Sequence, residues 1–178
     1  MTEGAPVRVV LVGMMGSGKT TVGRELARRT GWPLLDNDDL VRERTGREPA
    51  TIHAEDGEDA LHAAEIDALR AALERPGPAV IAAAGAVVDD ESARRDLEDA
   101  DVRVVWLRGR PETLRRRIGM GRGRREDARD LAWLAARAAE REPRYRTVAD
   151  QVIDVENRRP RAIATEILAA IGVAGDRP

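Results

Sequence analysis

The 178-residue sequence contains no cysteine and no phenylalanine, and it has only three tryptophans and one tyrosine. Without cysteine, the chain can form neither a disulfide nor a thiolate metal site. With so few aromatic side chains, it offers little surface on which nucleic-acid bases could stack. No apolar run approaches the roughly 18 residues that a membrane span needs, and the N-terminus, MTEGAPVRVVLVG, lacks the features of a secretion signal. These absences predict a cytoplasmic protein that does not bind a membrane.

The chain also has no large excess of positive or negative charge. The net charge is −2 and the isoelectric point is about 5.8, so neither nucleic acid nor an anionic membrane is expected as a partner. The length and the 42% share of hydrophobic residues predict one domain over residues 1–178, with short flexible tails at 1–5 and 173–178.

Lysine is nearly absent, since Lys19 is the only lysine among 30 basic residues. A position that keeps lysine in a chain so rich in arginine requires a compact ammonium. Lys19 lies in GMMGSGKT, residues 13–20, which matches the phosphate-binding pattern G-x-x-x-x-G-K-[ST] without a mismatch. Its glycines allow backbone N–H groups to converge on a phosphate, and a following helix adds its positive end. The alternative, a glycine turn that binds nothing, is disfavoured by the strand before it and the helix after it.

Short buried strands alternate with helices along the chain. Strands are expected at residues 7–12, 33–36, 79–84, 102–107 and 151–155. Helices are expected at residues 19–29, 39–45, 58–73, 91–100, 111–118, 128–148 with a break at Pro143, and 160–171. This alternation predicts an α/β sandwich with right-handed crossovers.

Two carboxylates, Asp36 and Asp38, lie where the second expected strand ends. The two-residue period of a strand places them on the same side, at the end of the sheet that faces a ligand crevice. One carboxylate there can hold Mg²⁺, and the other can accept the proton of an attacking hydroxyl. The alternative is an acidic turn that caps a helix beginning at Leu40, with Asp39 as the expected cap.

Arginines are concentrated between Arg108 and Arg125, a stretch that contains eight of them. Alone, such a run would predict a solvated face or a nucleic-acid patch. Beside a phosphate-binding loop, the glycine-rich segment GMGRGRRED at residues 119–127 predicts a mobile lid that excludes water and places a guanidinium on the transferring phosphoryl group. His53 and His62 are the only histidines, and they cannot form a metal cluster or a catalytic triad.

With these motifs in place, the sequence resembles the shikimate kinases, which are small P-loop kinases. The resemblance runs nearly end to end and includes LLDNDDLVRERTGR, DGEDALHAAE and EREPRYRTVAD in the family's order and spacing. It implies a three-layer α/β/α sandwich with a five-stranded parallel sheet. It also implies a monomer that uses ATP and Mg²⁺ to phosphorylate a small hydroxylated substrate.

The resemblance further implies roles for individual residues. Nucleotide binding is implied for Gly13, Gly16, Ser17, Gly18, Lys19, Thr20, Thr21, Arg117 and Arg158. Catalysis is implied for Lys19, Asp38 and a lid arginine, Arg122 or Arg124. Acceptor binding is implied for Asp38, His62, Ala84, Gly85 and Arg141, and Mg²⁺ binding for Thr20 and Asp36.

The sequence departs from the family pattern in the residues that are expected to bind the acceptor substrate. His62 stands where the family carries an arginine for the substrate carboxylate, and Ala83-Ala84-Gly85 replaces a triple glycine. We therefore expect a kinase with an altered acceptor site, for which shikimate is a poor substrate. One alternative is an authentic shikimate kinase of aromatic amino-acid biosynthesis, in which a nearby arginine has replaced the missing contact. Another is an ATP-binding regulator without catalysis, although such a protein would not need a base at Asp38.

Overall fold

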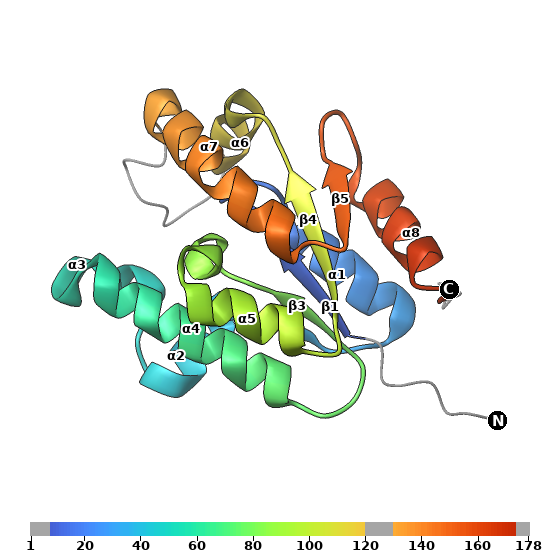
Figure 1. Ribbon diagram of the computed structural model, residues 1–178, viewed down its shortest axis with the longest axis horizontal. Coiled ribbons are helices and arrows are strands. Elements are labelled where there is room, and N and C mark those ends of the chain that lie inside the picture. The colour runs from blue at the N-terminus through green and yellow to red at the C-terminus, as the bar shows by residue number, and fades with distance from the viewer. Residues whose placement is uncertain (1–7, 120–129, 174–178) are drawn as a thin grey trace.

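The computed structural model of the chain describes residues 8–119 and 130–173, in which strands and helices alternate (Figure 1). The strands are β1 (Arg8–Val12), β2 (Leu34–Asp36), β3 (Ala79–Ala82), β4 (Arg103–Arg108) and β5 (Gln151–Asp154). The helices are α1 (Lys19–Thr30), α2 (Asn37–Thr45), α3 (Pro49–Asp56), α4 (Glu58–Glu74), α5 (Glu91–Asp99), α6 (Pro111–Gly119), α7 (Leu131–Val148) and α8 (Pro160–Ala170), with a 3₁₀ helix, η1 (Gly85–Asp89).

The strands form one parallel sheet in the order β2-β3-β1-β4-β5. β1 lies at its centre, and its residues from Val9 to Val12 are fully buried. A strand covered on both faces needs apolar side chains on both, which the run VVLV supplies. The chain moves outward from β1 to β2 and returns through β3 before it crosses to β4, so the winding direction changes beside β1. Ligands of open parallel sheets bind at the carboxyl ends of the strands near such a point.

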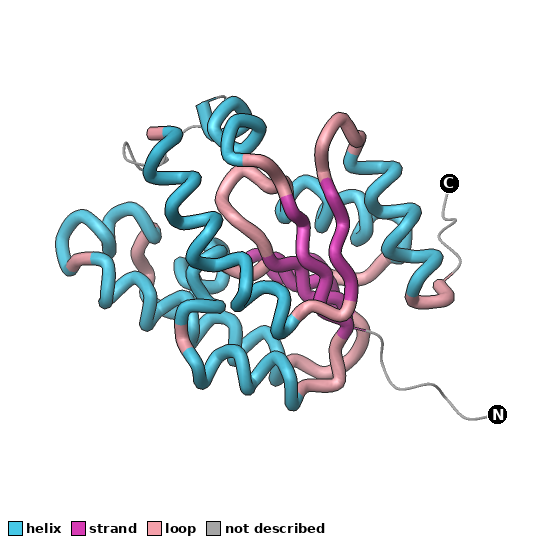
Figure 2. The backbone as a smooth tube through the Cα atoms, turned by 45° about the horizontal axis from the view of Figure 1, so that its top comes forward, coloured by secondary structure: helices cyan, strands magenta, loops and turns pink. Residues whose placement is uncertain are grey.

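Helices cover both faces of the sheet, as Figures 1 and 2 show. Val10, Val12 and Trp106 pack in the larger core, which the helices α2 to α7 cover. Val9 and Leu11 point to the opposite face, where α1 and α8 pack. The predicted three-layer α/β/α sandwich with a five-stranded parallel sheet is therefore confirmed.

One helix, α3, is missing from the sequence-based predictions. It begins with Pro49 at its first position and ends before Gly57, whose φ is +93°. Proline is favoured at the start of a helix, and glycine after its end. These two residues were the available signals, but the segment between them has only one buried side chain, Ile52, and therefore little periodicity.

α7 continues through Pro143, so the predicted break there is wrong. A proline inside a helix removes one hydrogen bond and clashes with the preceding turn. Here Leu134 before it and Tyr145 and Val148 after it are all buried in the same core. This packing holds both halves of the helix against the sheet and outweighs the local preference of proline.

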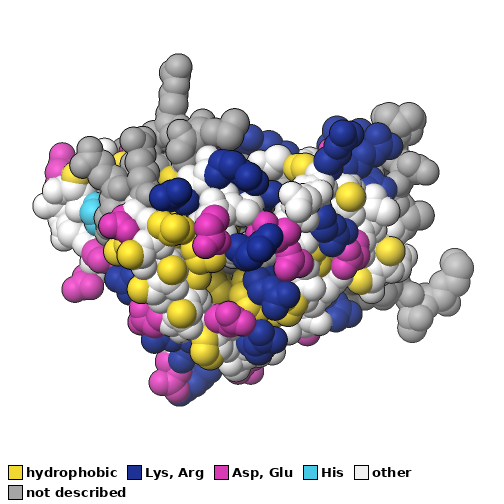
Figure 3. Space-filling view, turned by 90° about the horizontal axis from the view of Figure 1, so that it is seen from above, with side chains coloured by type: hydrophobic (Ala, Val, Ile, Leu, Met, Phe, Trp, Pro, Cys, Tyr) yellow, Lys and Arg dark blue, Asp and Glu magenta, His cyan; other side chains and the backbone are white. Residues whose placement is uncertain are grey.

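The predicted lid, residues 119–127, lies outside the described residues apart from Gly119, and so do most of the predicted tails. Among the described residues, no helix has the length and apolar character to span a membrane. On the face shown in Figure 3, basic and acidic side chains of the described residues are interspersed over much of the surface.

Candidate active site

The loop between β1 and α1 closes tightly on itself. Gly13 has φ +145°, and a Cβ there would lie 2.6 Å from the carbonyl oxygen of Leu107. Gly16 has φ +82°, and a Cβ there would lie 2.7 Å from the carbonyl oxygen of Leu114. Both positions therefore require glycine for their conformation and for space. The loop ends at Gly18, the N-cap of α1, so backbone N–H groups and a helix N-terminus are brought together as a phosphate site needs.

Lys19 bends back over this loop. Its Nζ donates to the carbonyl oxygen of Gly13 at 2.7 Å and to that of Met14 at 3.2 Å. An ammonium on a flexible stem can occupy this position, whereas a planar guanidinium is wider. The geometry gives a physical reason for the single lysine of the chain.

The other predicted nucleotide-site residues differ in their positions relative to the loop. Ser17 is buried, and its Oγ has no hydrogen-bond partner among the residues that the structure describes. Arg117, on α6, donates to the carbonyl oxygens of Ser17 at 3.4 Å and Val155 at 3.1 Å, which brings α6 and the segment after β5 to the loop. Arg158 instead pairs with Glu166 on α8, at 2.6 Å. Thr21 is exposed on the first turn of α1.

Two side-chain oxygens that could bind a metal ion lie together beside the loop. The Thr20 hydroxyl donates a hydrogen bond to Oδ2 of Asp36 at 2.7 Å. Hydroxyl and carboxylate oxygens suit Mg²⁺, which usually keeps water and binds substrate phosphates rather than a complete protein cage. Among the described residues, no cluster of three or more acidic or histidine side chains could serve as such a cage. The donor set therefore fits a Mg²⁺ ion shared with a nucleotide.

The acidic turn after β2 differs from its predicted form. α2 begins at Asn37, so Asp36 is its N-cap and accepts from the backbone N–H of Asp38 at 3.1 Å. The predicted cap, Asp39, lies in the first turn and pairs with Arg42 at 2.7 Å. The strand periodicity used to relate Asp36 to Asp38 does not apply, because the chain is already helical. The exposed Asp38 is instead placed beside Asp36 by the first turn of α2.

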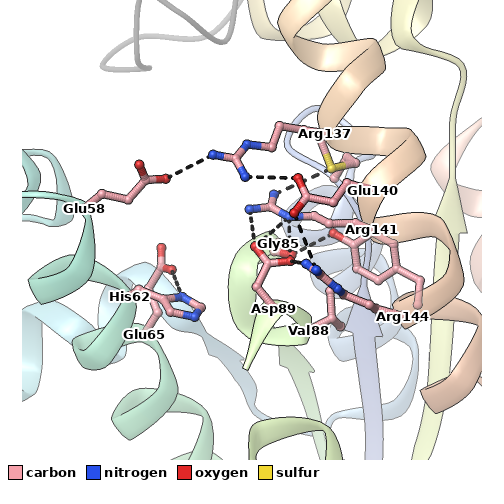
Figure 4. Close-up of polar contacts among 12 residues, drawn as sticks. Glu58, His62, Glu65, Gly85, Val88, Asp89, Arg137, Glu140, Arg141 and Arg144 are labelled. Carbon is pink, nitrogen blue, oxygen red and sulfur yellow. Dashed lines mark hydrogen bonds and ion pairs between the residues drawn. The ribbon is translucent and has the colours of Figure 1, made fainter. Parts of the chain in front are cut away.

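Arg141, the predicted acceptor-binding arginine, lies on α7 and is 8% exposed. Its Nη2 donates to Oδ2 of Asp89 at 2.7 Å, and its Nε lies 3.0 Å from the same oxygen. Arg144, one turn later, donates to Oδ1 of Asp89 at 2.7 Å (Figure 4). Burial opposes ionisation of Asp89, but its bonds to both arginines outweigh this and lower its pKa.

Asp89 and Arg144 are absent from the predicted site residues. The spacing of Arg141 and Arg144 places them on one helix face, which was a usable signal. The sequence does not indicate that both of them contact Asp89, which is more than 50 residues away.

His62, on α4, lies across from this ion pair in Figure 4. Its Nδ1 is 3.9 Å from Oε2 of Glu65, which is too long for a hydrogen bond but close enough for attraction between charges. The Glu65 carboxylate raises the pKa of His62 against the opposing effect of burial, and the charges of Asp89 and Asp90 add to the rise.

The first two residues of the Ala83-Ala84-Gly85 turn have backbone conformations that alanine can adopt. Ala83 is buried and donates its N–H to the carbonyl oxygen of Leu11 at 3.1 Å, which prolongs the sheet. Ala84 has φ −62° and ψ 145°, an ordinary extended conformation. Only Gly85 is tight, since a Cβ there would lie 3.0 Å from the carbonyl oxygen of Gly13. Two of the family's glycines can therefore be alanine here without backbone strain.

The lid arginines Arg122 and Arg124 lie outside the described residues. Among the remaining predicted residues, the phosphate loop follows β1, Asp36 ends β2, and Ala84 and Gly85 follow β3, whereas Arg158 is turned toward α8. Met14 contacts both Lys19 of the phosphate loop and Arg141 of α7. Its carbonyl oxygen accepts from Lys19, and its Sδ lies 3.7 Å from Nη1 of Arg141.

Comparison with known proteins identifies relatives of this chain. The sequence profile of the shikimate kinase family matches residues 15–172. A shikimate kinase from Moorella thermoacetica is 42% identical over 171 residues, which cover 93% of this chain and 95% of that protein. A shikimate kinase from Mycobacterium tuberculosis is 38% identical over 174 residues, which cover 93% of this chain and 94% of that protein.

Solved structures agree in fold. The shikimate kinase from Acinetobacter baumannii in complex with shikimate has a TM-score of 0.83 and 30% identity, covering 95% of this chain and 94% of its own. A gluconokinase from Sinorhizobium meliloti, at a TM-score of 0.61 and 23% identity, shares the fold; the match covers 94% of this chain and 92% of that one. The chain therefore belongs to the shikimate kinase family, and it is an ATP-dependent phosphotransferase that acts on a hydroxyl group.

Proposed function

We propose that the chain is a shikimate kinase that transfers the γ-phosphoryl group of ATP to a hydroxyl of shikimate. The observation that carries this proposal is the position of Met14, which contacts both Lys19 of the phosphate loop and Arg141 of the acceptor side. A nucleotide phosphate held by the loop and an anionic acceptor held by Arg141 would thus be neighbours. The close relatives named shikimate kinase support this choice of acceptor.

This proposal replaces the prediction of an altered acceptor site. That prediction depended on His62 and on the alanines of the Ala83-Ala84-Gly85 turn. The ordinary backbone of Ala84 removes the second reason, and the identity of 36–42% to shikimate kinases over at least 93% of the chain argues against a different acceptor.

The residues of the loop would bind and orient the nucleotide. Backbone N–H groups of residues 13–20 would surround the phosphates, and Lys19 would leave the carbonyl oxygens of the loop to contact the transferring group. Thr20 and Asp36 would hold Mg²⁺, which supplies charge stabilisation on the phosphates.

Asp38 would act as the base. The acceptor hydroxyl oxygen forms a bond to the γ-phosphorus, the bond from that phosphorus to the bridging oxygen of ADP breaks, and the hydroxyl proton passes to the Asp38 carboxylate. Its position beside Asp36, in the first turn of α2, supports this role, since its carboxylate would lie near the proposed Mg²⁺ site without being a direct ligand.

Turnover on a panel of acceptors tests the proposal. ADP formation by the purified chain would be measured with shikimate, quinate, a cyclitol and gluconate, with ATP and Mg²⁺ in each case. We expect shikimate to give the highest kcat/KM. Preference for an acceptor without a carboxylate would restore the altered-site hypothesis, and ATP binding without turnover on any acceptor would favour a regulator.

A further inference from the structure

Asp89 lies between two arginines on the acceptor side of the site, as Figure 4 shows. The side chain of Arg141 is 9% exposed, that of Asp89 22% and that of Arg144 33%. Solvent exposure therefore increases from Arg141 through Asp89 to Arg144. They come from two elements, because Asp89 ends η1 and both arginines lie on α7.

Asp89 occupies only one edge of the Arg141 guanidinium. It accepts from Nε and Nη2, which form the side of the planar fork. A guanidinium has five N–H groups, so the end formed by Nη1 and Nη2 keeps hydrogens that Asp89 does not use. On that end, Nη1 lies beside Met14 of the phosphate loop. An acceptor carboxylate can therefore bind Arg141 end-on while Asp89 fixes the plane of the guanidinium from the side.

Charge within the three residues favours an anion. Asp89 and Arg141 alone form a pair with no net charge, and such a pair attracts a carboxylate weakly. Arg144 adds a second positive charge on the other oxygen of Asp89, which leaves one positive charge in excess. Glu140 also approaches Arg144, but at 3.5 Å and with 45% of its side chain exposed, so solvent screens that contact more strongly.

We propose that Asp89 and Arg144 are positioning residues for the acceptor carboxylate: Asp89 orients Arg141, and Arg144 offsets the charge of Asp89 so that Arg141 attracts the anion. This inference rests on the proposed function. It also explains how the chain can bind a carboxylate with His62 where the family has an arginine.

Steady-state kinetics of a double-variant cycle test the inference. Arg144→Leu leaves the neutral pair and should raise KM for shikimate roughly five- to tenfold, with KM for ATP within about twofold, as expected for the loss of one partly buried charge at a binding site. Asp89→Asn leaves two positive charges and no carboxylate to fix the plane of the Arg141 guanidinium, so it should lower kcat more than it affects KM for shikimate.

The combined variant shows whether Asp89 and Arg144 act on shikimate binding through their charges or only through packing. Asp89→Asn with Arg144→Leu restores one positive charge, so KM for shikimate should return toward the wild-type value. A purely structural role predicts that the combined variant is at least as impaired as either single one. Arg146→Leu is the matched control, since Arg146 lies on the same helix and pairs with Glu142 at 2.7 Å.

The outcomes separate the two proposals. If the wild-type chain phosphorylates shikimate but Arg144→Leu leaves its KM unchanged, or if the combined variant shows no recovery, the inference is wrong and the proposed function stands. If the wild-type chain does not phosphorylate shikimate under conditions in which it binds ATP, both proposals fail together.

Discussion

The Nζ atom of Lys19 lies 2.7 Å from the carbonyl oxygen of Gly13, inside the curve of the phosphate loop. This contact holds the ammonium against the loop whose backbone N–H groups we propose as the nucleotide-phosphate site. The flexible stem of lysine allows the same ammonium to turn from this carbonyl oxygen to a phosphate oxygen.

Lys19→Arg should lose most of the activity while the fold is kept. The charge remains, but the wider guanidinium cannot take the place of the ammonium, so kcat should fall about 10²-fold or more. Arg28→Lys, an exposed conservative exchange on the same helix, serves as the control and should retain wild-type turnover. Turnover of the Lys19→Arg variant at the control's level would contradict the role of this loop.

Asp36→Asn should raise the Mg²⁺ concentration needed for half-maximal activity. Asparagine caps a helix about as well as aspartate, so α2 should stay intact while the metal loses a charged ligand. A Mg²⁺ titration of activity measures the effect. Asp39→Asn is the matched control, because Asp39 lies in the same turn and pairs with Arg42 on the surface. Equal Mg²⁺ requirements in the two variants would argue against the metal site.

Asp38→Asn should keep MgATP binding and lose phosphoryl transfer. Removal of a general base lowers kcat by roughly 10²- to 10⁴-fold, because the acceptor hydroxyl no longer loses its proton to a positioned group. Nucleotide binding, followed by calorimetry, and single-turnover kinetics separate the two effects. A variant whose kcat is preserved and whose Mg²⁺ requirement rises would assign Asp38 to the metal instead.

Tyr145→Phe should destabilise the fold. The buried Tyr145 hydroxyl donates to the carbonyl oxygen of Gly85 at 2.7 Å, and its ring stacks on Trp106 with centroids 5.5 Å apart. Phenylalanine keeps the ring but leaves the carbonyl oxygen unpaired, which costs about 1–2 kcal/mol in the free energy of unfolding. Denaturant unfolding of both proteins measures it. An unchanged midpoint and slope would show that the bond adds no net stability.

The contribution of His62 to stability should decrease as the pH rises. Glu65 raises the pKa of His62, burial opposes this, and Asp89 and Asp90 add to the rise, so the charged imidazole is favoured in the folded state. This stabilisation is complete below the usual histidine pKa of about 6.5 and is lost as the pH passes through the higher folded pKa. His62→Gln should therefore cost more free energy of unfolding at about pH 5.5 than at about pH 8.5. A difference that is constant with pH would contradict the charged pairing with Glu65.

The sequence alone determined the parts of the site that lie within a few residues of one another. The phosphate loop is predictable because its conformation depends on glycines and on the strand and helix that directly flank it. Asp36 and Asp38 were predicted to be neighbours because Asp36 ends a short strand and Asp38 follows two residues later, although the first turn of α2, and not the strand period, places them together. The buried runs that form β1 and β4 also indicated a parallel sheet, because strands covered on both faces need continuous apolar sequence.

The tertiary structure decided how distant segments complete the site. Asp89 and Arg144 are 55 residues apart in sequence, and they meet only because η1 and α7 pack on the same face of the sheet. The same packing carries α7 through Pro143 against its local preference. Such contacts depend on many apolar side chains summed over the whole core, and no local sequence pattern specifies which arginine a given carboxylate will reach.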